Sequence, residues 1–403
     1  MKKEFFLAAY VSPPPALLRN NFDETLMEKG YKLASDALFN CCLGYYEKLS
    51  SDKENVKKAL DLAEKYGLYY LAASENFSKK SDNFTVFLEE NFPHPALLGH
   101  QVFDEPAAKN FRKLAAMKEQ YKKAFKDKIF YVNLQPIYSP PYWLLNGMWT
   151  EKTDDFLSYE DYLNQYISAL NPEFLSYDFY PFLPNGLREN YFTQLSFVRK
   201  ISAKNHIPFW VYIQSCSWNS EEARVPSQNE VLWQANTSVL YGASGLQYFC
   251  FFTPYSNADK NFDVAMIDFF GNPTERYFAA KKAHIQIKSC EKFLLNADFL
   301  GVIKAGNSPL EIPLEDIIPL ENIKKIDGDV LIGAFKKEDE ILLWLTANRL
   351  DTDLKAVTIE FNGIFDLKIT LNGLTTIERT SKISQKLIGG EAFSISYKKS
   401  RKA

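Results

Sequence analysis

The sequence predicts an α/β protein in two parts: a (β/α)8 TIM barrel over residues 1–298 and a small C-terminal antiparallel β-sandwich domain over residues 299–403. Three observations lead to this fold class. Eight short apolar runs alternate with helical segments through the first three quarters of the chain. These runs are continuously apolar, as expected of parallel strands buried on both faces. After Leu295, helical periodicity gives way to strands of alternating polarity.

The predicted barrel strands share a short length and an apolar character. They cover residues 5–11, 37–43, 68–74, 96–103, 129–135, 174–180, 209–215 and 246–252. Eight strands in about 295 residues suit a barrel with modest loop insertions. The alternative is a doubly wound open sheet, which would carry a glycine-rich turn after its first strand if it bound a nucleotide. That turn reads SPPPALL and contains no glycine.

Helical periodicity follows several of these runs. Helices are expected at residues 54–67, 107–128, 158–171, 227–244 and 273–296. Ser227 with Glu230 three residues later matches the capping box that begins a helix. Ser158 with Asp161 comes close to the same motif.

The last hundred residues carry one-sided β patterning. Apolar residues alternate with polar ones at Val357, Ile359 and Phe361, at Leu367, Ile369 and Leu371, and at Phe393, Ile395 and Tyr397. Asn-Gly pairs at 362–363 and 372–373 predict hairpin turns. An antiparallel domain with one buried face accounts for this pattern.

Composition excludes several classes of protein. A net charge of -3 without a basic stripe argues against nucleic acid as a partner. Five cysteines without paired spacing argue against a disulfide framework and favour a reducing, cytoplasmic location. The apolar run near the N-terminus is at the short limit for a signal peptide. No apolar stretch reaches the roughly twenty residues of a membrane helix.

Motifs for several chemistries are missing from the sequence. The four histidines form no HExxH or other metal-ligand spacing, so no metal is expected. There is no G-x-S-x-G elbow for a catalytic serine and no Walker loop. Aromatic residues are abundant at 15%, enough to fill a large core or to stack against sugar rings.

Acidic residues instead follow two of the predicted strands. Barrel enzymes build their sites where strands end, and Asp104 and Glu105 end the fourth strand. A structural alternative is that these acids stabilise the start of the following helix through its dipole. Asp178 lies within the apolar sixth strand, where an acid is costly to bury unless it is paired or hydrogen-bonded.

Other polar side chains are expected on the same rim. Glu75 ends the third strand, Asn133 the fifth and Gln214 the seventh, with Trp218 in the loop beyond. A mouth with carboxylates and aromatic residues suits hydrolysis of a glycosidic bond. One acid protonates the leaving oxygen, and a second carboxylate attacks or activates water.

Three stretches resemble known glycoside hydrolases. The DEP sequence that contains Glu105 is similar to the NEP acid/base motif of retaining glycoside hydrolases built on (β/α)8 barrels. Residues 210–252 and 265–287 are similar to the seventh-strand to eighth-helix region of glycoside hydrolase family 42, the β-galactosidase-like group. The resemblance implies that Glu105 is the acid/base residue and that the C-terminal domain is the β-domain of such enzymes.

The chain departs from that family at the seventh strand, where the clan places its nucleophilic glutamate. Gln214 occupies the corresponding position, and no acid occurs from Ile207 to Ser220. The second carboxylate must come from elsewhere, with Asp178 as first candidate, Glu222 as second and Glu75 as third. Both retaining and inverting mechanisms remain open.

The sequence therefore favours a glycoside hydrolase that needs no cofactor and acts on an oligosaccharide or glycoside. Glu105 would be the general acid, with Asp178 or Glu222 as the second catalytic carboxylate. Residues expected to bind the carbohydrate are Asp104, Glu75, Asn133, Tyr180, Tyr212, Gln214, Trp218 and Arg224. The alternatives are a non-catalytic carbohydrate-binding barrel that lost its strand-seven nucleophile, and another barrel enzyme that uses the same acids for proton transfer.

Overall fold

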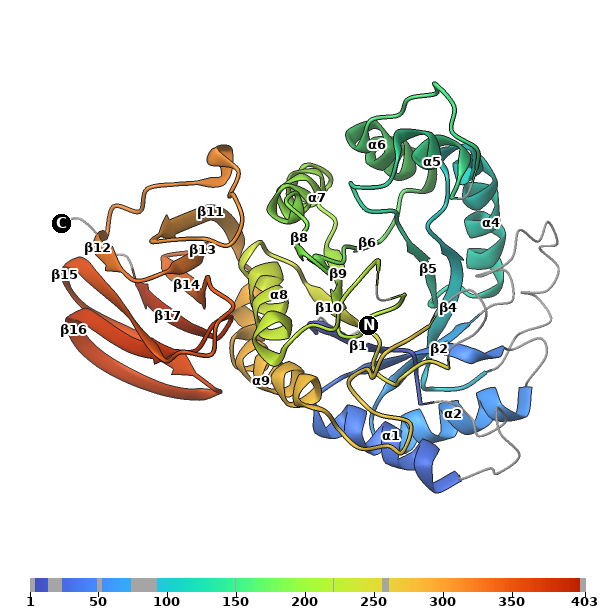
Figure 1. Cartoon of the computed structure of the whole chain (residues 1–403), viewed down its shortest axis with the longest axis horizontal. Helices are drawn as coiled ribbons and strands as arrows, with labels where there is room; N and C mark the ends of the chain where they lie inside the picture. The colour runs from blue at the N-terminus through green and yellow to red at the C-terminus, as the bar shows by residue number, and fades with distance from the viewer. Residues whose placement is uncertain are drawn as a thin grey trace.

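The computed structural model describes residues 4–13, 24–48, 53–73, 93–148, 150–219, 221–255 and 261–398. Eight parallel strands form a nearly closed barrel, and an antiparallel domain follows it, as predicted (Figure 1). The barrel strands are β1 (Phe6–Tyr10), β2 (Cys41–Lys48), β3 (Tyr69–Ala73), β4 (Leu97–Asp104), β5 (Ile129–Asn133), β6 (Leu175–Asp178), β9 (Phe209–Gln214) and β10 (Gly245–Phe249). Each overlaps one of the eight apolar runs.

The barrel closes between β5 and β6. Around the sheet the strand order is β5-β4-β3-β2-β1-β10-β9-β6. Beyond the end of β5, Leu134 forms a parallel bridge with Tyr177 of β6, and its backbone N–H donates to the carbonyl of Ser176 at 2.8 Å. All carboxyl ends of the strands therefore meet at one mouth.

Alternation along each strand divides the apolar residues between two cores. Leu7 and Ala9 of β1 pack in the layer between the sheet and the helices. Phe6, Ala8 and Tyr10 belong to the cluster inside the barrel. Strand residues have a period of two, so the interior is a packed core that opens only at the mouth.

Helices surround the barrel between its strands. They are α1 (Glu24–Asp36), α2 (Lys53–Lys65), α4 (Phe111–Ala124), α5 (Pro141–Asn146), α6 (Tyr159–Leu170), α7 (Tyr191–Asn205), α8 (Gln228–Leu240) and α9 (Glu275–Leu294). The capping box of Ser227 and Glu230 is present at the start of α8. Ser158 caps α6 by accepting from the backbone N–H of Asp161 at 3.0 Å. Helices α1, α5 and α7 were not anticipated from the sequence.

The C-terminal domain is a single seven-stranded sheet in the order β11-β13-β14-β17-β15-β12, with β16 paired to β15. Its strands are β11 (Asp298–Ala305), β12 (Ile323–Asp327), β13 (Val330–Lys337), β14 (Glu340–Ala347), β15 (Lys355–Leu371), β16 (Leu374–Leu387) and β17 (Ala392–Lys398). The alternating apolar residues of β15 and β17 face one common core, as their pattern predicted.

One of the two predicted hairpin turns is wrong. Asn372 and Gly373, both with positive φ, form the two-residue turn between β15 and β16. Asn362 and Gly363 instead lie inside the long strand β15, beside a register shift between Glu360 and Phe365. Gly363 has a φ of 127°, so the glycine here permits a bulge rather than a reversal of the chain.

Helices α8 and α9 join the two domains (Figure 1). The indole N–H of Trp233 on α8 donates to Asn348 Oδ1 at 2.9 Å. Gly333 of β13 lies so close to α8 that a Cβ there would come within 2.2 Å of the Leu240 carbonyl oxygen. The sheet is therefore docked tightly on the barrel.

In the part of the chain that the structure describes, no helix combines the length and the apolar character that a membrane span requires. The five cysteines all lie in described residues, are buried and form no disulfide.

Candidate active site

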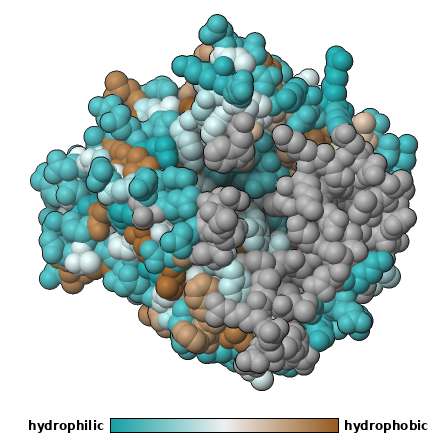
Figure 2. Space-filling view, turned by 45° about the vertical axis from the view of Figure 1, so that its right-hand side comes forward, coloured by the Kyte–Doolittle hydropathy of each residue, from teal (hydrophilic) through white to brown (hydrophobic). Residues whose placement is uncertain are grey.

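A cavity of about 670 Å³ opens at the carboxyl ends of the barrel strands. Figure 2 shows a recess near the middle of the view, with hydrophilic residues inside it. Residues that end strands line the cavity, among them Tyr10 of β1 and Phe249 of β10. Eight of the eleven predicted site residues also line it: Asp104, Glu105, Asn133, Asp178, Tyr180, Tyr212, Trp218 and Glu222.

Asn133 links two of the acids. Its Nδ2 donates to Asp104 Oδ1 at 3.2 Å and to Asp178 Oδ1 at 3.1 Å. Strand pairing places Asp104 directly beside Asn133. An amide NH2 group has two hydrogens to donate, so this one side chain bridges the two carboxylates.

A buried network of hydrogen bonds fixes the orientation of the Asn133 amide. Ser176 Oγ donates to Asn133 Oδ1 at 3.1 Å, so the Nδ2 side of the amide faces the two acids. Gln247 Nε2 donates to Ser176 Oγ at 2.9 Å, and the Tyr131 hydroxyl lies 2.7 Å from Gln247 Oε1. This buried network holds the amide in one rotamer.

Asp178 carries a strongly perturbed carboxyl group. It is only 6% exposed. Burial, together with the nearby charge of Asp104, raises the pKa of Asp178 to about 7. Hydrogen bonds from Asn133 and with Glu105 lower this pKa in part by stabilising the charged form.

Glu105 follows β4 in an uncommon backbone conformation. Its φ is 48°, in the left-handed region that glycine favours. The Glu105 backbone N–H donates to the Asn133 carbonyl at 2.8 Å, which holds the residue at the rim. Such strained residues cluster at active sites.

The helix-dipole alternative for this acidic pair is not supported. A 3-10 turn at Ala108–Asn110 follows the pair, and α4 begins only at Phe111. No acidic residue lies in the first turn of α4.

Aromatic rings form another part of the wall. Trp218 packs edge-on against Tyr180, with ring centroids 4.8 Å apart, and against Phe249 at 5.5 Å. Tyr212 is buried and its hydroxyl lies 3.1 Å from that of Tyr131. Flat apolar faces beside carboxylates are the surface that a sugar ring needs.

Glu222 lies on the exposed rim of the cavity. Its carboxylate accepts hydrogen bonds from Trp218 Nε1 and from Asn219 Nδ2, each at 3.1 Å. In this arrangement the side chain orients Trp218.

Gln214 is placed differently from the expectation. It is fully buried and is not part of the described cavity wall. Its Nε2 donates to the Arg224 carbonyl at 2.9 Å and to the Phe182 carbonyl at 3.3 Å. Its Oε1 accepts from the Phe182 backbone N–H at 3.0 Å. The side chain therefore clamps two loops, which explains why an amide rather than a carboxylate occupies this position.

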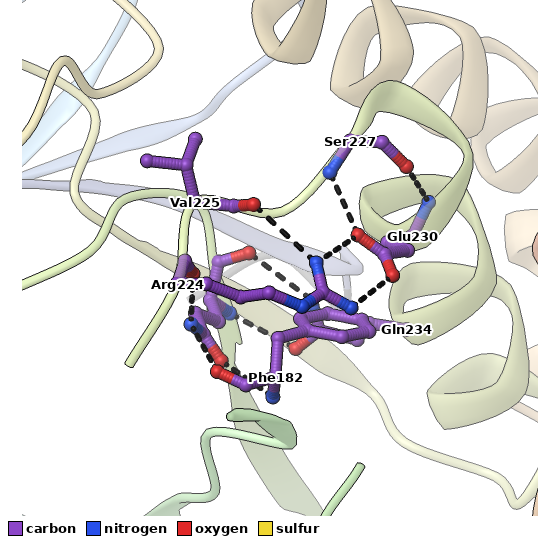
Figure 3. Close-up of polar contacts among 7 residues, drawn as sticks. Phe182, Arg224, Val225, Ser227, Glu230 and Gln234 are labelled. Atoms are coloured by element: carbon purple, nitrogen blue, oxygen red, sulfur yellow. Dashed lines mark hydrogen bonds and ion pairs between the residues drawn. The ribbon is translucent and has the colours of Figure 1, made fainter. Parts of the chain in front are cut away.

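Arg224 is also directed away from the cavity. Its guanidinium pairs with both carboxylate oxygens of Glu230, at 2.7 and 2.5 Å (Figure 3). Glu230 also caps α8 by accepting from the Ser227 backbone N–H at 2.8 Å. The arginine thus anchors the loop after β9 to the start of α8. Glu75 lies outside the described residues.

Several cavity residues were not predicted from the sequence. Tyr138 comes from the loop after β5, Trp143 from helix α5, and Arg188 from the segment after β8 (Gly186–Leu187), where no strand pattern points to them. Tyr10 and Phe249 end their strands and could have been found by the rule that identified Asp104. Among the described residues, no group of three or more His, Cys, Asp or Glu side chains is arranged to hold a metal ion.

The fold and this mouth define a class: a TIM barrel with paired acids at the carboxyl ends of β4 and β6. No family model and no curated protein matches the sequence.

Solved glycoside hydrolases do share the fold. The β-galactosidase of the psychrophilic Marinomonas ef1 superposes with a TM-score of 0.51 and 9% identity, covering 70% of this chain and 60% of that one. The glycoside hydrolase family 30 subfamily 8 xylanase Xyn30A of Clostridium acetobutylicum gives a TM-score of 0.50 and 9% identity, covering 98% of this chain and 95% of that one. The α-amylase of Geobacillus thermoleovorans also gives 0.50 and 9%, covering 99% of each chain.

At 9% identity these similarities show a common fold. They include a β-galactosidase, but the resemblance to family 42 in particular stays a prediction.

Proposed function

We propose that the protein is a glycoside hydrolase in which Glu105 is the general acid and Asp178 is the second catalytic carboxylate. Both carboxyl groups line the open mouth of the barrel, and burial together with the charge of Asp104 raises the pKa of Asp178; this pairing of a perturbed acid with a second acid carries the proposal. Neighbouring acids in different environments differ in pKa, so one can hold a proton while the other is ionised. That is the state in which acid-assisted cleavage of a glycosidic bond begins.

The steps follow from how each acid is held. Glu105 is half-buried at the rim on a side chain with three rotatable bonds, so it can turn from Asp178 toward the leaving oxygen of a bound sugar. Asp178 is held in place by Asn133. As Glu105 gives its proton to the leaving oxygen and the glycosidic C–O bond breaks, the Asp178 carboxylate bonds to the anomeric carbon. A water that loses its proton to Glu105 then hydrolyses this ester, which releases the sugar and restores both acids.

The spacing of the acids favours retention of configuration. Inverting enzymes need about 6.5–9.5 Å between their carboxyl groups to admit a water, whereas retaining ones need about 5–5.5 Å. Glu105 is close enough to Asp178 to lower its pKa through a hydrogen bond, and Asn133 Nδ2 binds both Asp104 and Asp178 at 3.2 and 3.1 Å. This close grouping supports Asp178 as the nucleophile of a retaining mechanism rather than as a base that activates an intervening water.

The test is a panel of aryl glycosides and oligosaccharides of both anomeric configurations, assayed with wild type and with Glu105→Gln. Wild type should hydrolyse at least one member, and the first product seen by NMR should keep the substrate's configuration. Glu105→Gln should lower kcat by about 10²–10⁴ while the melting temperature and sugar binding are preserved. A fully active Glu105→Gln would sink the assignment, and an inverted product would exclude Asp178 as nucleophile.

A second candidate is a non-catalytic carbohydrate-binding barrel. The observation that favours it is the clamped amide of Gln214 at the strand end where the related clan carries its nucleophile. A wild-type protein that binds sugars in calorimetry yet cleaves none of the panel would support this alternative.

A further inference from the structure

Arg188 is the one cationic side chain in the described part of the cavity wall. Four acidic side chains share that wall: Asp104, Glu105, Asp178 and Glu222. A cavity with this surplus of carboxylates repels anions unless a cation is placed to receive them. The position of Arg188 therefore bears on which sugars can enter.

The loop after β6 fixes the position of Arg188. The small hairpin of β7 (Phe182–Leu183) and β8 (Gly186–Leu187) ends directly before it. The Arg188 backbone N–H donates to the Pro181 carbonyl at 2.8 Å, and its Nε donates to the Tyr180 carbonyl at 3.3 Å. The guanidinium carbon lies 3.9 Å from the ring centroid of Tyr138, a cation–π contact.

These contacts engage one edge of the guanidinium and one of its faces. Among the described residues, no acceptor reaches the terminal nitrogens Nη1 and Nη2, and no acid forms an ion pair with Arg188. Arg224 shows the contrasting case, because both of its terminal nitrogens are taken by Glu230. Arg188 is thus held in place with its two-pronged donor edge available.

Arg188 is near the catalytic acids without neutralising them. The charges of Asp178 and Arg188 both act on the buried Tyr138 hydroxyl: burial raises the pKa of Tyr138, Asp178 raises it further and Arg188 opposes the rise. The charge that raises the pKa of Asp178 is that of Asp104. Because no ion pair joins Arg188 to a described acid, its charge is available to a bound anion.

We propose that Arg188 binds an oxyanion substituent of the substrate, the carboxylate of a uronic acid residue, so that the enzyme prefers acidic over neutral sugars. This inference rests on the proposed hydrolase function. A guanidinium edge matches a carboxylate with two parallel N–H···O bonds. A sulfate ester presents the same oxyanion chemistry.

The test compares substrates that differ only in this substituent. Pairs of 4-nitrophenyl glycosides are assayed: glucoside against glucuronide, and galactoside against galacturonide, in both anomers, with 6-sulfated glycosides as a further arm. The readout is the ratio of kcat/KM for the acidic to the neutral member of each pair. Wild type should favour the uronide in at least one pair.

Three variants locate the source of that preference. Arg188→Gln should lower the acidic-to-neutral ratio by about 10- to 100-fold, mostly through KM, because a charged hydrogen-bond partner is lost. Arg188→Lys keeps the charge but loses the two-pronged donor edge of the guanidinium, so it should retain part of the preference. It also keeps the proposal testable if Arg188→Gln does not fold. Arg379→Gln, at a site 74% exposed on the C-terminal sheet, is the matched control and should leave the ratio unchanged.

The outcomes separate this inference from the proposed function. A preference for sulfated sugars that depends on Arg188 supports the oxyanion site with the other anion. A neutral preference in wild type, or a ratio that Arg188→Gln does not change, overturns it. If no glycoside is cleaved, the hydrolase proposal fails, and calorimetry with glucuronate and galacturonate against glucose decides the site. If wild type binds glucuronate or galacturonate and Arg188→Gln does not, the oxyanion site is upheld. If wild type binds neither uronate, the oxyanion site is overturned.

Discussion

The carboxyl ends of β6 and β9 are neighbours in the barrel, and each carries a buried polar side chain. At β9, every polar atom of the Gln214 side chain is bonded to the backbone of two loops. At β6, Asp178 lines an open cavity and has a pKa raised by burial and by a second acid. Burial alone therefore does not distinguish a structural polar residue from a functional one. The distinguishing property is a perturbed pKa, which marks a charged form that the surrounding protein destabilises.

The largest expected effect is on the β6 side of this comparison. Asp178→Asn keeps the size of the side chain but removes the carboxylate charge of the proposed nucleophile. We expect kcat to fall by at least about 10³-fold on whichever glycoside wild type cleaves. Asp366→Asn, at a site 66% exposed on the C-terminal sheet, is the matched control. Activity within tenfold of wild type in Asp178→Asn would remove Asp178 from the mechanism.

A substitution of Gln214 on β9 should lower the stability of the protein rather than its catalytic rate. Gln214→Glu turns an N–H donor that serves the Arg224 and Phe182 carbonyls into an acceptor that repels them. At pH 7.5 we expect the free energy of unfolding, measured with denaturant, to fall by about 3 kcal/mol. Gln120→Glu, the same change at an exposed position of α4, should change it by less than about 0.5 kcal/mol. Faster turnover in Gln214→Glu would mean that this side chain reaches the substrate.

The same contrast shows how far the sequence predicts this molecule. Continuous apolar runs located all eight barrel strands, because parallel strands are buried on both faces. The rule that sites form at strand ends brought Asp104, Asn133 and Asp178 to one mouth, because carboxyl ends of parallel strands meet there.

The strand-end rule failed where contacts with neighbouring loops determine whether a side chain reaches the cavity. Alternation places Gln214 on the same side of β9 as Trp210 and Tyr212, yet the backbone of Phe182 takes up its amide. Arg188 and Tyr138 reach the cavity from loops whose course no periodic pattern records. Which polar group is already satisfied is a property of the packed structure, so sequence alone could not separate Gln214 from Asp178.

The pH dependence of catalysis should reveal the state of Asp178. Its pKa is raised to about 7 in the folded free enzyme, and its carboxylate is the reactive form. We therefore expect kcat/KM, which reports free-enzyme pKa values, to fall about tenfold per pH unit below pH 7. The raised pKa also means that the contribution of Asp178 to stability is fully present below about pH 4 and is lost as pH rises to about 7, because the unfolded state releases this proton first. A flat rate profile between pH 5 and 7 would contradict this assignment.

The smallest expected effect tests the link between the acids. The hydrogen bond from Asn133 lowers the pKa of Asp178, and Ser176 fixes the donor's orientation. Asn133→Ala removes that donor, so the acid limb of the kcat/KM profile should move up by about one pH unit, and kcat at pH 7 should fall about tenfold. A purely structural role would lower activity equally at every pH. Asn362→Ala, on the exposed side of β15, is the control, and a limb that stays in place in Asn133→Ala would show that Asn133 does not set the charge state of Asp178.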